Sequence, residues 1–200
     1  MNETTFHSSA SPAHHHAVQF YGTDDSLFTT VAGFLAAGLV EQQPAVVIAT
    51  PSHRNSIVEY LCGRLIDCDK AIREGDLLLL DAEAMLDLFM VNGMPNADLF
   101  EVNVGRVIEQ TLNGRQTTVI RAYGEMVDVL WKNGQPDAAI AVEILWNKLA
   151  LKHNFALLCG YSMGSFYKQT KQLEQVCAQH SYVVPGSATL VPFRRRRKSA

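Results

Sequence analysis

Five short apolar segments, each followed by a helical pattern, constrain the fold of this chain most strongly. Ala45–Ala49 (AVVIA) and Leu77–Leu80 (LLLL) are continuous apolar runs, typical of strands covered on both faces. Ala17–Tyr21, Thr117–Ala122 and Phe155–Gly160 complete the set. Strands that alternate with helices predict an α/β fold of three layers: a mainly parallel five-stranded sheet with helices on both faces.

The helical segments are marked by caps and breakers. Helices are expected over about 26–37, 51–65, 82–91, 98–112, 125–132 and 136–153, with a last one ending near 179. We expect one domain over residues 14–180, a disordered N-terminal tail over 1–13, and an extended basic C-terminal tail over 181–200.

The charge of the chain is uneven. The run RRRRK at 194–198 holds five of the 17 basic residues, which leaves 12 against 20 acidic residues, a net charge of −8. Because the rest of the chain is this acidic, we expect no nucleic-acid partner, apart from contacts made by the basic tail 194–198. The four cysteines form no CxxC pair, and no apolar run approaches the length of a membrane span. The sequence predicts a cytoplasmic protein with reduced thiols.

Polar side chains gather where the predicted strands end. In open parallel sheets, ligands bind beyond the carboxyl ends of the strands. These ends deliver candidate ligand-binding residues: Tyr21, Asp24, His53, Asp81, Arg121, Tyr123, Glu125, Cys159 and Tyr161. For single members such as Asp24 the alternative is a helix cap, and for Arg121 with Glu125 it is an internal ion pair that braces the turn.

Three other kinds of site fit the sequence less well. The turn Gly22–Leu27 (GTDDSL) has one glycine, two acids and no lysine, so we expect no phosphate-binding loop and no cofactor. Adjacent histidines 14–16 offer metal ligands, but neighbours in a strand point to opposite faces, so we expect a strand lead-in and no metal. An enzyme would need Cys159, His53 and Asp81 as nucleophile, base and orienter. Cys159 lies in an apolar run, so we expect no enzyme.

Six motifs, in order, resemble one known family. HAVQFYGTDDSL, ATPSHRNSIVEYL, DLLLLDAEAML, VIRAYGEMVDVLW, AVEILWNKL and ALLCGYSM resemble the MEDS domain, the sensory domain of DcmR-type regulators, over about His16–Lys168. The resemblance implies a RecA-like fold with a degenerate phosphate-binding loop, in which the fourth strand lies centrally between the first and the third. It adds His16 to the candidate ligand-binding residues, and it places Trp131 at a matching position that is more typical of core.

The resemblance implies a sensor of simple hydrocarbon derivatives. We expect a stand-alone module that binds a small organic ligand. It is expected to relay the presence of the ligand to a signalling partner such as a histidine kinase or a regulator, and a homodimer is another possible partnership. No kinase-like segment fits after residue 170, so we expect the output to pass through a partner, a dimer contact or the basic tail. The alternatives are a protein-interaction scaffold whose pocket is empty and a small-molecule enzyme.

Overall fold

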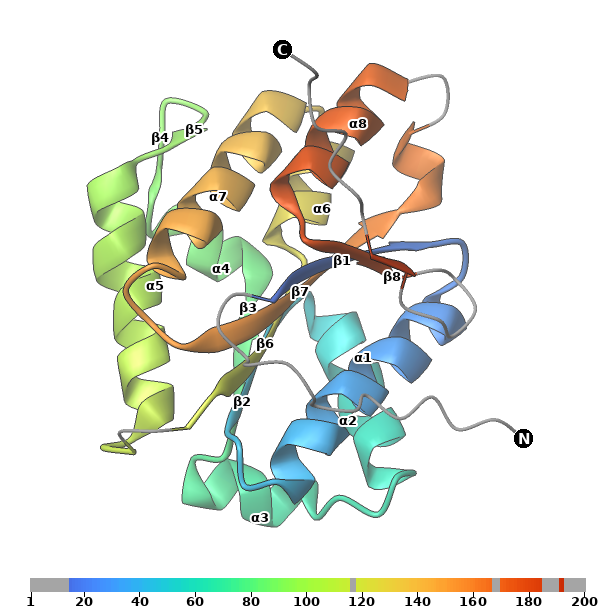
Figure 1. Ribbon diagram of the computed structural model, residues 1–200, viewed down its shortest axis with the longest axis vertical. Coiled ribbons are helices and arrows are strands. Elements are labelled where there is room, and N and C mark those ends of the chain that lie inside the picture. The colour runs from blue at the N-terminus through green and yellow to red at the C-terminus, as the bar shows by residue number, and fades with distance from the viewer. Residues whose placement is uncertain (1–14, 116–117, 167–169, 185–190, 193–200) are drawn as a thin grey trace.

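A computed structural model of the protein describes residues 15–115, 118–166, 170–184 and 191–192 (Figure 1). The expected N-terminal tail, His14 and the basic run 194–198 lie outside the described residues. The strands are β1 (His16–Tyr21), β2 (Ala45–Ala49), β3 (Leu77–Asp81), β4 (Met90–Val91), β5 (Met94–Pro95), β6 (Ile120–Gly124), β7 (Phe155–Ser162), β8 (Tyr182–Val184) and β9 (Val191–Pro192). The α-helices are α1 (Asp24–Val40), α2 (Pro51–Cys62), α3 (Cys68–Glu74), α4 (Ala82–Asp87), α5 (Ala97–Leu112), α6 (Met126–Lys132), α7 (Pro136–Leu149) and α8 (Thr170–Gln179), and η1 (Met163–Phe166) is a 3-10 helix.

The central sheet has the strand order β3-β2-β6-β7-β1-β8-β9. Its first six strands run parallel, and β9 pairs with β8 in the antiparallel sense. The prediction of five strands is therefore wrong in its count. The sixth parallel strand, β8, has only three residues and comes from the stretch expected to be a tail. Such a short run gives no strand signal by itself and depends on β1, whose Ala17–Gln19 it pairs with.

The predicted position of the fourth strand is correct only in part. That strand, β6, lies centrally, but its neighbours are β2 and β7 rather than the first and third strands. β1 instead lies beyond β7. Strand neighbours are chosen by long-range packing, which motifs along the chain do not encode.

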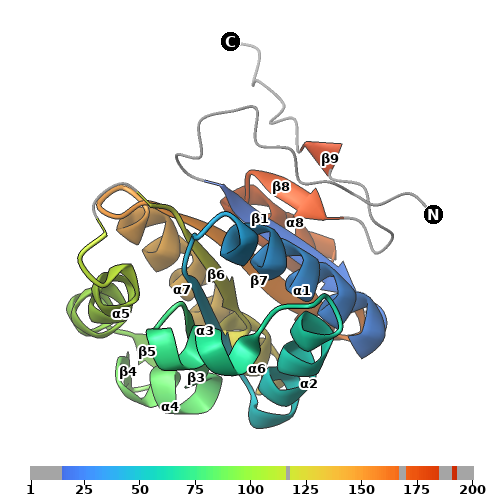
Figure 2. The same cartoon turned by 90° about the horizontal axis from the view of Figure 1, so that it is seen from below.

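Helices cover both faces of the sheet, which confirms the α/β fold with three layers. Helices α1, α2 and α3 lie on one face, and α4 to α8 lie on the other (Figures 1 and 2). Two apolar cores fill the spaces between the layers. One joins α1, α2 and α3 to the sheet, and the other joins α4, α5, α6, α7 and Val176 of α8 to it.

Local sequence explains two elements that were not predicted. Helix α3 begins after Asp67, whose side chain accepts a hydrogen bond from the backbone amide of Lys70, and ends at Gly75 with φ +75°. The hairpin β4-β5 ends the expected 82–91 helix early, because Asn92 and Gly93 both adopt positive φ, at 51° and 79°. An Asn-Gly pair in this conformation suits a two-residue hairpin turn.

The pleat of the strands sends the predicted site residues to different faces. Side chains alternate along a strand, and Cys159 and Tyr161 belong to the core beneath α7 and α8. His16 is two residues before Val18, which belongs to the same core. Tyr21 and Tyr123 belong to the core beneath α1. The sheet therefore separates residues that the sequence assigns to one cavity.

Within the described part of the chain, no helix is both long and apolar enough to cross a membrane.

Two glycines of α1 provide a matched test of packing against the sheet. A Cβ on Gly38 would lie 2.3 Å from Cγ of Arg121, whereas a Cβ on Gly33 would meet only the end of the Arg64 side chain, at 3.5 Å. We expect Gly38→Ala to lower the free energy of unfolding by about 1–3 kcal/mol through overpacking. Gly33→Ala should raise it by up to about 1 kcal/mol through helix propensity. Urea denaturation of both variants measures the difference, and equal effects would contradict this packing.

Candidate functional site

The ten predicted ligand-binding residues do not share one cavity. They divide between a cluster beneath α7 and α8, a network at the carboxyl edge of the sheet, and two residues that belong to neither. The cluster contains His16, Cys159 and Tyr161, and the network contains Tyr21, His53, Tyr123 and Glu125, with Asp24 at its rim.

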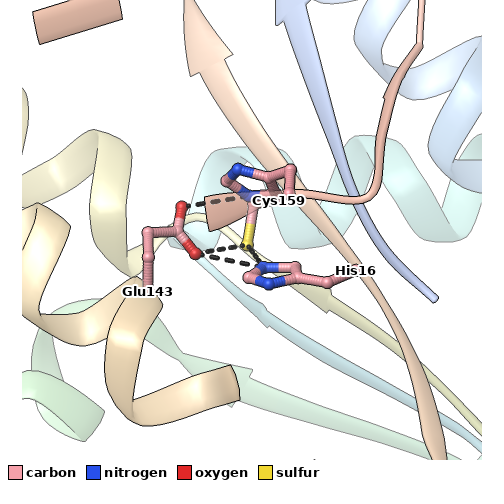
Figure 3. Close-up of side chains that lie close together, drawn as sticks. His16, Glu143 and Cys159 are labelled. Carbon is pink, nitrogen blue, oxygen red and sulfur yellow. Dashed lines mark hydrogen bonds and ion pairs between the residues drawn. The ribbon is translucent and has the colours of Figure 1, made fainter. Parts of the chain in front are cut away.

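Four metal-ligating side chains meet beneath α7 and α8, and we call them the buried cluster: His16 of β1, Glu143 of α7, Cys159 of β7 and His180, which follows α8. Figure 3 shows His16, Glu143 and Cys159 pointing toward one another. Nε2 of His16 lies 3.1 Å from Oε2 of Glu143 and 3.4 Å from Sγ of Cys159. Sγ of Cys159 lies 3.4 Å from Oε2 of Glu143. All four residues are buried, and Glu143 has no exposed surface.

Hydrogen bonds from a surrounding shell fix how these side chains point. The amide nitrogen of Asn147 donates to the carbonyl of Gln179, so its oxygen faces Nδ1 of His16 at 3.0 Å and accepts the proton there. Nδ1 of His180 donates in the same way to the carbonyl of Val176 at 2.7 Å. Both histidines therefore turn Nε2 toward Glu143. The hydroxyl of Tyr161 donates to Oε1 of that carboxylate at 2.9 Å.

The charge of Glu143 dominates the electrostatics of the cluster. Burial alone raises a carboxyl pKa, but His180 and His16 outweigh it and hold the pKa of Glu143 well below its usual range. Burial, and then His180, lower the pKa of His16. Burial and the neighbouring Glu143 raise the pKa of the Cys159 thiol well above its ordinary value. The thiol is therefore a poor nucleophile as it stands.

A pocket of about 810 Å³ opens onto the buried cluster at the amino ends of β1 and β7. His16 and His180 form part of its wall, and their rings lie 4.1 Å apart between centroids. Apolar side chains from α7 and β7 line much of the rest: Ile144, Trp146, Phe155 and Leu157. The sequence predicts a cavity at the opposite, carboxyl end of the strands, so this pocket was not expected.

At the carboxyl edge, a hydrogen-bonded network closes the ends of β1, β6 and β7; we call it the edge network. Glu125 accepts hydrogen bonds from Nδ1 of His53 at 2.7 Å and from the hydroxyl of Tyr123 at 3.0 Å. Tyr21 donates to Asp128 at 2.9 Å, and Lys132 lies 2.8 Å from the same carboxylate. Each buried charge in the edge network thus has partners within the protein, which favours a bracing role.

The edge network perturbs the two groups at its centre in opposite directions. The hydrogen bond with Glu125 raises the pKa of His53. Burial alone would raise the pKa of Glu125, but His53 and the backbone amide of Thr50 hold it below its usual range. Both shifts favour the charged pair.

Asp81 and Arg121 lie apart from both groups. Asp81 caps α4 and pairs with Arg54 at 3.3 Å. Arg121 stands near the amino end of β6, where its Nε donates to Gln43 at 2.7 Å and its guanidinium lies over the ring of Phe34. The ion pair considered between Arg121 and Glu125 is wrong, because β6 begins at Ile120 rather than at residue 117. Arg121 therefore enters the strand instead of leaving it.

The considered catalytic combination also does not form. Cys159 contacts His16 and Glu143 on the α7 face, whereas His53 contacts Glu125 and Asp81 contacts Arg54. Sequence reasoning missed Glu143 and His180 of the buried cluster, and Asp128 and Lys132 of the edge network. A signal for Glu143 is present, since it interrupts the apolar run Ala141–Trp146, where a charge requires partners.

Comparison with known proteins identifies the family. The family described as the MEthanogen/methylotroph, DcmR Sensory domain, MEDS, matches residues 15–181, most of the chain. The chain belongs to the MEDS family. All four residues of the buried cluster and the whole edge network lie within the matched MEDS region. A search of the curated proteins finds no match to this MEDS chain.

Solved structures share the fold of this MEDS domain. A KaiC-like protein from the hyperthermophilic archaeon Pyrococcus horikoshii OT3 is similar at 16% identity and a TM-score of 0.55, over 84% of this chain and 70% of that one. An uncharacterized protein from Pyrococcus horikoshii, solved in complex with an unknown peptide, is similar at 14% identity and a TM-score of 0.58, over 86% and 77%. Identities this low show the fold alone.

His53→Ala tests the edge network. It removes a donor from the buried Glu125, and we expect a loss of about 1.5–3 kcal/mol in the free energy of unfolding. His153→Ala, at the amino end of β7, serves as the matched control and should change little. Chemical denaturation across pH gives the second readout. Because the pKa of His53 is raised in the folded protein, the stability that the pair contributes is lost as pH rises through the pKa of His53. Because the pKa of Glu125 is lowered, the same stability is lost as pH falls through the pKa of Glu125. A difference between wild type and His53→Ala that does not vary with pH would contradict the pairing.

Proposed function

We propose that this MEDS domain senses a small organic molecule, of the size and polarity of a simple hydrocarbon derivative, in the pocket beside the buried cluster. Membership of a sensory family supports a signalling role. The observation that supports ligand binding is the pocket itself. Its volume of about 810 Å³ falls within the range of small-molecule sites, about 300–1,000 Å³.

The lining of the pocket supports this class of ligand. Apolar walls from Ile144, Trp146 and Phe155 suit a hydrocarbon part, and the imidazoles of His16 and His180 at the wall suit one polar group. Small-molecule sites commonly combine an apolar lining with a few convergent polar groups. The edge network offers less, because its buried charges already have partners.

The walls of the pocket also suggest how occupancy is relayed. The pocket is bounded by the carboxyl ends of α7 and α8, through Lys148 on one side and Gln179 on the other. A ligand that bridges these ends favours the arrangement in which they are close, and it shifts the equilibrium only through this differential affinity. The proposed output is contact with a separate signalling protein, such as a histidine kinase or a regulator.

A thermal-shift screen of short-chain alcohols, aldehydes and amines tests the pocket. A ligand at about one hundred times its Kd should raise the Tm of the full chain by about 5–10 °C. Ile144→Trp, which fills the pocket, should abolish the shift. Val102→Trp, at an exposed aliphatic position on α5, serves as the control and should retain it.

Three results would contradict the proposal. The first is that no compound in the screen shifts the Tm. The second is a shift that survives Ile144→Trp but is lost in His53→Ala, which would place the ligand at the edge network. The third is a signalling partner that binds wild type and Ile144→Trp equally while added compounds change nothing, which would favour a scaffold with an empty pocket.

A further inference from the structure

The buried cluster has the ligand types and the spacing of a transition-metal site. One ligand atom from each of His16, Glu143, Cys159 and His180 lies within 4.8 Å of all the others. The closest pairs are 3.1–3.4 Å apart. Bonds of about 2.0–2.3 Å place neighbouring ligand atoms of a tetrahedral zinc ion roughly 3.2–3.6 Å apart. The separations among Nε2 of His16, Sγ of Cys159 and Oε2 of Glu143 are therefore close to the edges of a zinc tetrahedron, and His180 lies 3.4 Å from the other oxygen of the same carboxylate.

Both histidines present a lone pair to the centre of the cluster. The Nδ1 protons of His16 and His180 are held by Asn147 and by the Val176 carbonyl. A neutral imidazole with its proton on Nδ1 has a free lone pair on Nε2, and metal-binding histidines are typically oriented by such outer hydrogen bonds. Nε2 of His180 is buried and makes no hydrogen bond in the described residues, although it lies 3.4 Å from Oε1 of Glu143. This nitrogen, with a lone pair and no hydrogen bond to the residues described, is available to a metal ion.

Charge balance gives an independent reason. Glu143, His16 and His180 are all buried, and a ligand-type atom of each faces the others. If both imidazoles are neutral, two nitrogen lone pairs face a carboxylate, which is repulsive. A divalent ion with one carboxylate, one thiolate and two neutral imidazoles has no net charge. Such a site avoids the cost of an uncompensated charge in the core.

We propose that the buried cluster binds one divalent transition-metal ion of the zinc type in each chain. Mixed nitrogen, sulfur and oxygen ligands suit zinc and its neighbours, whereas calcium and magnesium prefer oxygen alone. Binding releases the thiol proton of Cys159 to solvent as the sulfur–metal bond forms, so the affinity rises with pH. The pocket provides the route of entry past His16 and His180. The proposal goes beyond the sensory function, because it requires no organic ligand.

Cobalt(II) is the probe for the test, since its spectrum reports both geometry and sulfur ligation. The full chain, freed of metal by a chelator, should bind one Co²⁺ with the intense visible bands of a four-coordinate ion and a near-ultraviolet sulfur-to-cobalt charge-transfer band. Cys159→Ser should lose the charge-transfer band, while Cys68→Ser, at a buried cysteine on the other face of the sheet, should keep it. His180→Ala should weaken Co²⁺ binding by at least about ten-fold.

A further variant distinguishes Co²⁺ binding at the buried cluster from Co²⁺ binding by the N-terminal histidines. His14→Ala with His15→Ala should leave the stoichiometry and the spectrum unchanged. The proposal is overturned if wild type binds no stoichiometric Co²⁺, if the charge-transfer band survives Cys159→Ser, or if removing His14 and His15 abolishes binding. The wild-type spectrum shows whether sulfur is a ligand, and the two cysteine variants assign that ligand to Cys159. Because Co²⁺ binding is measured without organic compounds, a failure of the metal proposal can be distinguished from a failure of the sensory proposal.

Discussion

The charge on Glu143 is the constraint on which the functional half of this molecule depends. A carboxylate with no exposed surface is costly in an apolar core unless opposite charge or hydrogen bonds compensate it. Tyr161 and Cys159 each donate a hydrogen bond to it, and two histidines from distant parts of the chain lie beside it. These contacts join α7, β1 and β7 to the segment after α8. His16 and His180 also form part of the pocket wall, so their contacts with the buried Glu143 help to fix the shape of the pocket.

The structure contains two polar groups with different roles. The edge network at the carboxyl ends of the strands is saturated, with Glu125 and Asp128 each held by several donors. It occupies the place where open parallel sheets usually bind ligands. The buried cluster lies beneath α7 and α8, opens onto a pocket at the amino ends of β1 and β7, and contains a nitrogen of His180 that makes no hydrogen bond within the described part of the chain. This contrast moves the proposed binding function from the carboxyl edge to the amino ends of β1 and β7.

Local sequence was enough for the fold class but not for the site. The continuous apolar run at 45–49 marks a strand that is buried throughout, whereas the run at 77–80 forms the edge strand β3, in which only Leu77 is buried. β8 is not predicted, because three residues are too few to show a strand periodicity. The predicted position of Arg121 is wrong, because β6 begins later than its apolar run indicates. His16, Cys159 and Tyr161 were chosen, but their partner Glu143 was not. Its helix packs against the same face of the sheet as His16, which is more than a hundred positions away, and no spacing in the sequence records that contact.

An anomalous-difference map from crystals of the full chain, collected at the absorption edge of the metal that elemental analysis finds in the purified protein, tests the central claim most directly. The buried cluster predicts a single peak about 2.0–2.3 Å from Nε2 of both histidines, Sγ of Cys159 and a carboxylate oxygen of Glu143. A peak elsewhere on the chain, or a cluster that diffraction shows filled only by hydrogen-bonded side chains, would contradict it.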